Sequence, residues 1–372
     1  MRGNEVTCRI DESGITARGE DDVLVAMTYE STGGESPFDS SIHVLSLNES
    51  PFPPLADVRR ALELGIEKVN RYPDPTCLGL IGELSRHHGV PEDDIVVGAD
   101  SLQIALQLVW ASAFEPGSQI MYPTPSFEAY DVISRMSRVT PIKVPLTSEN
   151  AHDLPAMAAL AATVKIVLLS SPHGLTGVPV KDVELRKFID ALPPETIVVL
   201  DEAFPEFVRD PSAVRGIDFY RDYQQVVVLR SFSNAHGLAD LRVGYAIAHA
   251  PIIDMLHEQI PPFAISALGQ NAAITSLRNI AQIEERVEVL IRERERIWAA
   301  LTRCGFNPPR SQGPFLWLSP EERCFEFALR CREEGIAVRL YSNGGLRISV
   351  GCPEANSRLM NVAYRLHAER MR

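Results

Sequence analysis

The chain has 372 residues, of which 45% are hydrophobic and 23% charged, and its formal net charge is −13. A chain of this length and composition can bury a large core and is expected to form two domains. The negative charge argues against a nucleic-acid or anionic-membrane partner, and no apolar run approaches the roughly 20 residues of a membrane span.

The first part of the chain, residues 1–44, is largely polar and is predicted to be an N-terminal arm. It contains a Gly/Ser-rich stretch from Ser31 to Ser41. The segment from Met1 to Glu12 lacks the apolar region of a signal peptide, and the six cysteines form no CxxC pair. We therefore expect a cytoplasmic protein with reduced thiols and no metal site.

From residue 45 to about 262, short β-branched runs alternate with amphipathic stretches such as Leu102–Phe114 and Phe127–Arg135. This alternation predicts a large α/β domain of three layers, in which helices cover both faces of a mostly parallel sheet. Ligands bind at the carboxyl ends of strands in such sheets. The candidate strands are Asp94–Val97, Gln119–Tyr122, Thr140–Val144, Ile166–Ser170, Ile197–Asp201, Val226–Arg230 and Gly244–His249.

Residues 263–372 are predicted to form a connecting helix and a small α+β domain, to which part of the N-terminal arm can also belong. Apolar residues recur at helical spacing from about Ala264 to Cys304, which predicts one long helix between the domains; a helix that binds a partner is the alternative. The elements expected after it are Phe315–Leu318, Cys324–Glu334, Ala337–Leu340, Leu346–Val350 and Glu354–Met371.

Four segments carry a recognisable pattern: LNESPF at residues 47–52, RYPDP at 71–75, RSFSNAHGLADLRVGY at 230–245 and GCPE at 351–354. In this order they resemble motifs of the fold-type-I, pyridoxal-phosphate (PLP) aminotransferases, and most closely those of the histidinol-phosphate aminotransferase branch. The resemblance covers nearly the whole chain from Val44. It implies the PLP-dependent transferase-like fold, which is that of aspartate aminotransferase, and a homodimer.

The resemblance implies cofactor-binding roles for residues around the strand ends. Asp201, in VLDEA, matches the carboxylate that pairs with the pyridine nitrogen and keeps it protonated. Ser231, Ser233 and Arg242 match the cup that binds the phosphate group. Ser101 matches the serine that follows a Gly-x-Gly turn at the same end of the cofactor.

Three further residues have counterparts in the family. Tyr72 matches a tyrosine that reaches the phosphate of the neighbouring subunit. Phe127 lies where an aromatic side chain stacks on the cofactor ring, although a core phenylalanine explains it equally well. Arg347, in GLRIS, matches the arginine that binds the substrate carboxylate through two hydrogen bonds.

The reactive end of the motif set departs from the family. Asn234 stands where the family has the lysine that holds PLP as a Schiff base and moves protons, and a carboxamide nitrogen is neither basic nor nucleophilic. Gly174 and Phe204 stand where the family has an asparagine and a tyrosine that donate to the ring hydroxyl. Because these losses gather at one end of the ring, they indicate natural divergence.

The phosphate side also departs from the family, since Asp100 and Asp240 replace glycines. A carboxylate within a few ångströms of a phosphate would cost about 1–4 kcal/mol.

Two histidines are candidates for a replacement base, because the pKa of histidine suits proton transfer near neutral pH. His173 lies in the loop that matches the family's Asn-Pro segment, and His236 follows Asn234 by two positions. In some lysine-less relatives that act on sugar nucleotides a histidine takes the lysine position itself. The alternative is that His173 and His236 are ordinary loop residues without a catalytic role.

Three functions remain open from the sequence. The first is an enzyme on an amino-acid-like carboxylate that binds PLP or pyridoxamine phosphate (PMP) non-covalently, or a preformed adduct. The second is a PLP-independent enzyme that uses the vacated pocket, with Arg347 for a carboxylate and a histidine or an aspartate for proton transfer. The third is a non-catalytic paralogue whose site is filled by side chains such as Leu175, Phe204 and Phe127. Ordinary transamination is not expected.

Overall fold

The computed structural model describes residues 42–372 except 114, 116 and 342. Most of the expected N-terminal arm, residues 1–41, lies outside the described residues. The described residues form two compact units. The large unit comprises Asn48–Glu295 and Pro309–Leu316, and the small unit comprises residues 42–47, Arg296–Pro308 and Trp317–Arg372. The domain limits expected from the sequence, residues 45–262 and 263–372, stay a prediction.

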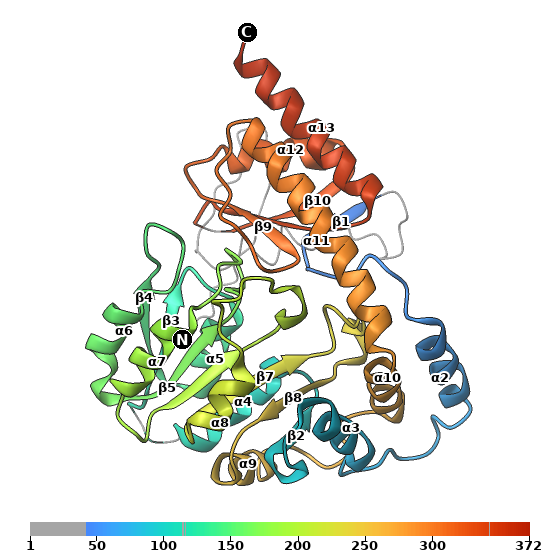
Figure 1. Cartoon of the computed structure of the whole chain (residues 1–372), viewed down its shortest axis with the longest axis vertical. Helices are drawn as coiled ribbons and strands as arrows, with labels where there is room; N and C mark the ends of the chain where they lie inside the picture. The colour runs from blue at the N-terminus through green and yellow to red at the C-terminus, as the bar shows by residue number, and fades with distance from the viewer. Residues whose placement is uncertain (1–41, 114, 116, 342) are drawn as a thin grey trace, which may run out of the picture. The chain divides into compact units, whose positions relative to one another are not determined.

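A seven-stranded sheet forms the centre of the large unit, in the order β2-β8-β7-β6-β5-β3-β4. Strand β8 runs antiparallel to both of its neighbours, and the other strand pairs are parallel, which confirms a mostly parallel α/β sheet (Figure 1). The strands are β2 (Ile95–Gly98), β3 (Gln119–Thr124), β4 (Thr140–Pro145), β5 (Val164–Ser170), β6 (Ile197–Asp201), β7 (Val226–Ser231) and β8 (Gly244–Ile247).

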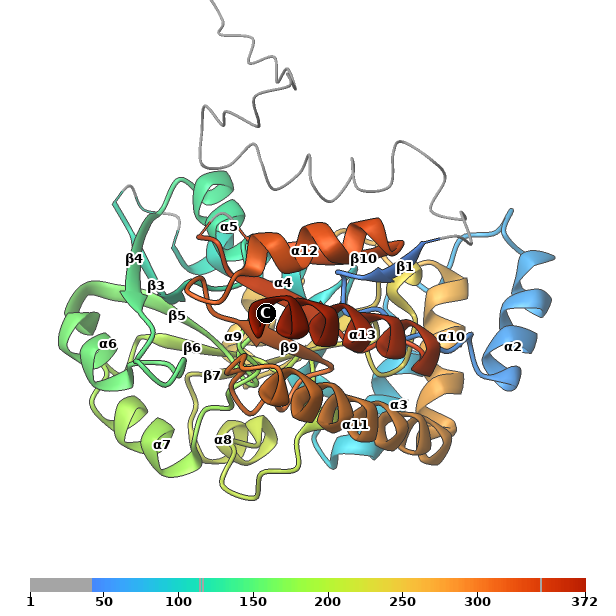
Figure 2. The same cartoon turned by 90° about the horizontal axis from the view of Figure 1, so that it is seen from above.

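Helices cover both faces of this sheet (Figures 1 and 2). The central strands are buried over almost their whole length, as is typical of parallel strands enclosed by helices. One face packs on α4 (Ser101–Ser112), α5 (Ala129–Ser137) and α9 (Ala250–His257) in a single apolar core. The other face carries α6 (Leu154–Leu160), α7 (Asp182–Asp190) and α8 (Gly216–Asp222).

Three further helices of the large unit lie beside the β2 edge. Helix α10 packs on α2 and α3, and α3 contacts β2. The bounds of these helices are α2 (Ala56–Ile66), α3 (Leu78–His88) and α10 (Ala267–Arg278). The large unit also contains short 3₁₀ turns at Glu92–Asp94, Ala161–Thr163, Pro205–Phe207 and Ala239–Leu241.

The prediction of one continuous helix from Ala264 to Cys304 is wrong. The structure has two helices, α10 and α11 (Ile280–Arg303), separated at Asn279. The backbone of Asn279 is not helical, and its side chain donates to Thr275 O and accepts from the side-chain Nε2 of Gln282. An asparagine side chain that bonds the neighbouring turns competes with the helix ladder, although the apolar spacing continues across the break.

The small unit contains a four-stranded sheet in the order β1-β10-β11-β9. Strand β1 (His43–Leu45) pairs in parallel with β10 (Ile336–Leu340), which is antiparallel to β11 (Leu346–Ser349). Helices α12 (Cys324–Glu333) and α13 (Pro353–Arg370) pack on each other, and α12 contacts β10. The boundary between the two units falls inside α11 and inside β9 (Phe315–Leu318).

Candidate functional site

Polar residues from neighbouring strands meet at one edge of the large sheet. Strands β5, β6 and β7 end at Ser170, Asp201 and Ser231, and Ser170 lies opposite Asp201 in the register. Strand β2 is parallel to β7, because both are antiparallel to β8, so Asp100 follows β2 at the same edge. Carboxyl ends of parallel strands are where α/β sheets bind ligands, so this edge is the candidate site.

Asp201 has one satisfied and one unsatisfied oxygen. Its Oδ2 accepts a hydrogen bond of 2.9 Å from the hydroxyl of Tyr130. Its Oδ1 is buried and has no hydrogen-bond partner among the described residues. Burial raises the pKa of Asp201 to about 6, against the hydrogen bond from Tyr130 and with a further rise from nearby Asp100 and Glu202. A buried carboxylate oxygen without a donor is costly, so Asp201 is suited to a ligand that offers an N–H group.

Aromatic and small residues surround Asp201. Phe127 lies edge-on to Tyr130, with 6.0 Å between the ring centroids. A Cβ added at Gly174 would lie 3.7 Å from the Cβ of Phe127, and the amide of Gly174 donates to Ser170 Oγ at 3.1 Å. Phe204 packs against Phe315 at 5.3 Å between ring centroids and offers no hydroxyl group. This side of the site therefore has apolar contacts in place of side-chain donors.

Asn234 lies in the loop that follows β7 and is half-buried. Its side-chain nitrogen donates to the carbonyl of Ala203 at 3.1 Å. The amide thus links the loops that follow β6 and β7, which is a structural contact.

The residues expected to bind a phosphate lie together at the β7 and α4 side of the site. Ser231 Oγ donates to Ser233 Oγ at 2.9 Å and accepts from the amide of Ser233 at 3.0 Å. The guanidinium of Arg242 forms an ion pair with Asp100. Ser101 is the first residue of α4, next to this ion pair.

Two further residues with expected roles lie on other elements. Tyr72 lies between α2 and α3, its side chain is 86% exposed, and its ring centroid is 5.0 Å from that of Phe263. Arg347 lies on β11 of the small unit and is buried, and its guanidinium donates to the carbonyl of Ser46 at 3.1 Å. The guanidinium carbon of Arg347 also lies 5.7 Å from the ring centroid of Tyr341.

His173 is completely buried in its loop. Its Nδ1 accepts from the amide of Thr176 at 3.2 Å, and its ring meets that of His152 edge-on at 5.1 Å. Burial, together with His152, holds the pKa of His173 well below its usual value. The ring is therefore neutral, with one nitrogen committed to the turn that it closes.

His236 is held on the side of α10. Its Nδ1 is 2.7 Å from Ser276 Oγ, and its Nε2 is 4.0 Å from a carboxylate oxygen of Glu206. Burial lowers its pKa to about 3, with smaller contributions from His87 and Arg230. In the described part of the chain, neither His236 nor His173 forms a hydrogen bond with Asn234 or Asp201, so the geometry gives their proposed role as bases no support.

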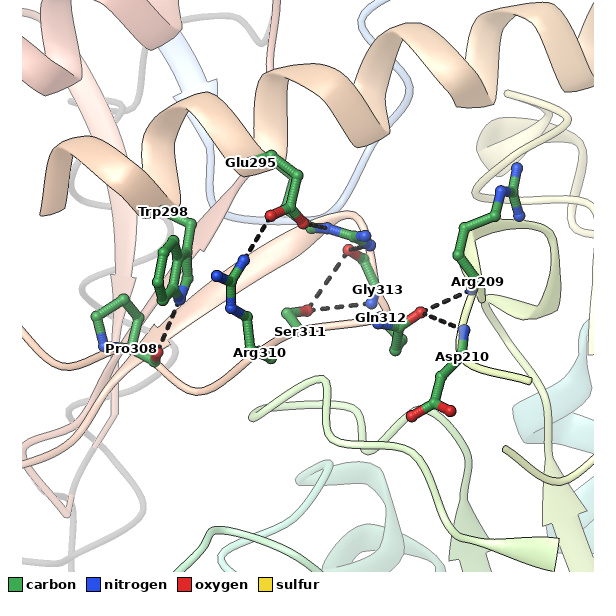
Figure 3. A network of polar contacts seen from close by, with 10 residues as sticks. Arg209, Asp210, Glu295, Trp298, Pro308, Arg310, Ser311, Gln312 and Gly313 are labelled. Atoms are coloured by element: carbon green, nitrogen blue, oxygen red, sulfur yellow. Dashed lines mark hydrogen bonds and ion pairs between the residues drawn. The ribbon is translucent and has the colours of Figure 1, made fainter. Parts of the chain in front are cut away.

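A segment of the large unit, residues 309–314, is tied to two loops that follow β5 and β6 (Figure 3). Gln312 accepts hydrogen bonds from the amides of Arg209 at 2.7 Å and Asp210 at 3.2 Å, and its own amide donates to Gly177 O at 2.7 Å. Gly177 has φ +73°, and a Cβ there would lie 1.9 Å from Ser311 Oγ, so only glycine allows this approach. The segment therefore fixes the loop that contains His173 and Gly174.

Sequence reasoning missed Tyr130. Its partner Asp201 is 71 residues away, so no local pattern indicates the hydrogen bond; the one available signal was its place three residues after Phe127.

The raised pKa of Asp201 predicts a pH-dependent stability. In the folded chain Asp201 keeps its proton up to about pH 6, while in the unfolded chain it loses it near 3.8. The protonated form thus stabilises the fold at low pH, and this contribution is lost as the pH rises through about 6. We expect the free energy of unfolding of the wild type, relative to that of Asp201→Asn, to fall by about 3 kcal/mol between pH 3.8 and about pH 6. Urea unfolding of both proteins across the window checks this, and parallel pH profiles would contradict it.

The chain resembles known proteins over most of its length. The family model for aminotransferase class I and II matches residues 41–361. An aromatic amino acid aminotransferase of Streptomyces avermitilis is 42% identical over 326 residues, which cover 87% of this chain and 90% of that protein. A protein of the same name from Thermobifida fusca is also 42% identical, with coverage of 86% and 89%.

Solved structures share the fold at lower identity. A histidinol-phosphate aminotransferase of Sinorhizobium meliloti, solved in complex with pyridoxal-5′-phosphate, superposes with a TM-score of 0.81 at 24% identity, covering 91% of this chain and 94% of that one. An aromatic aminotransferase of Pyrococcus horikoshii gives 0.77 at 20% identity, covering 92% and 99%. The expected PLP-dependent transferase fold is confirmed, and the similarity to the histidinol-phosphate branch is one of fold.

Proposed function

The chain belongs to the aminotransferase class I and II family, and on that premise we propose that it binds an amino-acid-like carboxylate compound at a site without the family's cofactor lysine. The observation that carries the proposal is the buried Oδ1 of Asp201, which has no partner among the residues described. Tyr130 donates to Oδ2 of this carboxylate, so Oδ1 remains available to accept a hydrogen bond from a pyridine N–H or an amino group of a ligand. The names of the 42% identical relatives support an aromatic amino acid, or the corresponding 2-oxo acid, as the substrate.

In the form that family membership favours, PLP or PMP is held without a covalent bond. When bound, the cofactor ring would supply an acceptor for electrons from the substrate. The ring end fits the residues present, since Asp201 can accept from the ring nitrogen and Phe127 and Tyr130 supply aromatic surfaces. The phosphate end does not fit as folded, because Arg242 already pairs with Asp100. The residues present therefore fit only the ring end of the cofactor.

That ion pair favours a second candidate, in which the site takes the carboxylate compound directly and uses no PLP. Asp201 would then bind the amino group of the ligand. The role that the resemblance gives to Arg347, binding of a substrate carboxylate, stays a proposal. His173 and His236 gain no support as bases from their contacts, so Asp201 is the proton acceptor that we favour in this candidate.

The two candidates are separated by titration of the purified protein with PLP, PMP and L-phenylalanine, followed by borohydride reduction and intact mass measurement. Saturable PLP or PMP binding without a covalent mass shift supports the first candidate. Binding of L-phenylalanine alone, weakened in Arg347→Ala and not restored by Arg347→Lys, supports the second, because lysine keeps the charge and loses the paired donors. Absence of binding in every titration rejects both and indicates a non-catalytic paralogue.

We also propose that the chain forms a homodimer through an apolar surface of the large unit. Several apolar side chains near the end of α2 and the start of α3 are exposed by 46–86%, namely Leu64, Ile66, Val69, Tyr72, Leu78 and Phe263. Tyr72 and Phe263 contact each other, which joins the loop after α2 to the loop before α10. Exposed apolar patches of this kind mark protein contacts, and the resemblance implies that Tyr72 reaches the phosphate site of a neighbouring subunit.

The dimer proposal predicts a particle of twice 41.1 kDa in light scattering after size exclusion. Val69→Glu is expected to give monomers, because a charge would be buried at the contact. Val183→Glu, at an equally exposed valine on α7, is the matched control and is expected to stay dimeric. A wild type that runs as a monomer at all concentrations would contradict the proposal.

A further inference from the structure

The guanidinium of Arg242 is held in place by contacts within the chain. Its Nη1 donates to the carbonyl of Ala239 at 2.7 Å and lies 3.4 Å from Ser233 Oγ, and its Nη2 pairs with Asp100. The backbone of Arg242 has φ +50°, a left-handed conformation that is costly for a side chain of this size. These contacts direct the guanidinium toward the start of α4.

Asp100 uses both of its carboxylate oxygens there. Oδ1 accepts from the amide of Gln103 at 2.7 Å, which caps α4, and Oδ2 pairs with Arg242. The first turn of a helix of 12 residues and an adjacent arginine are the groups that bind an external anion in many proteins. In this chain the carboxylate of Asp100 already accepts hydrogen bonds from both the first turn of α4 and Arg242.

The backbone of Asp100 is tightly packed at this contact. Gly244 of β8 lies against it, and a Cβ at Gly244 would be 2.4 Å from Ser101 N and 2.6 Å from the carbonyl carbon of Asp100. Ser231, the last residue of β7, pairs with Gly244 in the sheet and is hydrogen-bonded to Ser233 in the loop that follows. The hydroxyl of Ser231 and the guanidinium of Arg242 therefore already donate to partners within the chain.

Electrostatics at the site disfavour a further anion. Asp100 and Asp201 both lie where strands end on the same side of the sheet, and the charge of Asp100 adds to the rise in the pKa of Asp201. A phosphate dianion placed beside Arg242 would meet the charge of Asp100 as well, whereas an ammonium or protonated ring nitrogen would be attracted by both carboxylates.

We propose that Asp100 takes the place of a bound anion at this end of the site, so that the site selects a nitrogen-bearing ligand without a phosphate group. The inference rests on the proposed function in taking Asp201 as the group that binds the ligand nitrogen. Asp100 is therefore a specificity-determining residue. It excludes phosphorylated ligands by its charge, and it occupies Arg242 and the Gln103 amide, which would otherwise donate to a phosphate group.

The first test uses inorganic phosphate alone, so that it does not depend on any ring ligand. We compare the wild type with Asp100→Asn, which keeps an N-cap acceptor and removes the charge, and with Asp100→Gly. The wild type is expected to show no rise in Tm with phosphate beyond that with chloride of equal ionic strength. Both variants are expected to bind phosphate at least about tenfold more tightly and to show a rise. Asp240→Asn, at an exposed carboxylate two residues from Arg242, is the control and is expected to behave as the wild type.

The second test compares pyridoxamine with PMP by calorimetry. The wild type is expected to bind pyridoxamine at least as tightly as PMP, and Asp100→Gly is expected to shift the ratio of the two Kd values toward PMP by roughly tenfold. A wild type that binds phosphate saturably, or that prefers PMP as strongly as Asp100→Gly does, would overturn the proposal. If neither ring compound binds, the proposed function loses its first candidate while the phosphate test still decides the role of Asp100.

Discussion

Replacing Asp201 by alanine is expected to weaken the binding of pyridoxamine, or of whichever nitrogen ligand the wild type binds, by roughly 100-fold or more. The variant removes the one buried carboxylate oxygen at this edge that lacks a donor in the described structure, and with it the charge that attracts a protonated nitrogen. Asp201→Asn keeps an acceptor oxygen and is expected to lose only about tenfold. Isothermal titration of the three proteins gives the affinities.

A matched control exists on the same sheet. Asp94 also accepts a hydrogen bond from a tyrosine, Tyr220, but it precedes β2 and so lies at the opposite edge from Asp201. Asp94→Ala removes a part-buried pair of the same two residue types and is expected to leave ligand affinity within about twofold of the wild type. Equal affinities for the wild type and Asp201→Ala would refute the role given to this carboxylate.

The wild type is expected to gain no mass when it is treated with PLP and then reduced with borohydride. Asn234→Lys is expected to be labelled covalently under the same treatment. A lysine amine attacks an aldehyde and a carboxamide does not, so the variant supplies the nucleophile that residue 234 lacks. We expect Asn234→Lys combined with Asp100→Gly to label more completely than Asn234→Lys alone, because the second change frees Arg242. Intact mass spectrometry after reduction measures the labelled fraction.

The control for this prediction is Asp240→Lys, which adds a lysine at an exposed position close in the sequence. It is expected to gain no more mass than the wild type. Labelling of the wild type itself would mean that another lysine serves, and an unlabelled double variant would mean that residue 234 does not correspond to the family lysine.

Much of the large sheet could be predicted from the sequence, because each of its strands is a short apolar run with turns on either side. Strand β6 begins and ends where predicted, at Ile197 and Asp201, and β9 matches Phe315–Leu318. The other strand limits differ by one or two residues, as at β5, which begins at Val164. The break at Asn279 escaped prediction because apolar spacing continues through it while a single side chain interrupts the helix.

The candidate site was harder to predict, because its contacts join residues far apart in the chain. Tyr130 and Asp201 are 71 residues apart, and Asp100 and Arg242 are 142 apart. From the sequence, Asp100 was expected to repel a phosphate. That it would itself pair with Arg242 depends on β2 and β7 lying on either side of β8, which no local pattern reveals.

The parallel pairing of β1 with β10 determines the order in which the chain can fold as it leaves the ribosome. His43 of β1 pairs with Ile336, so this strand must wait for nearly 300 further residues before its partner exists. The large sheet, by contrast, is complete in sequence by Ile247. Domains fold as units during synthesis, with early segments first. Here the earliest described strand belongs to the unit that is completed last, and its unpaired edge is exposed to other nascent chains in the meantime.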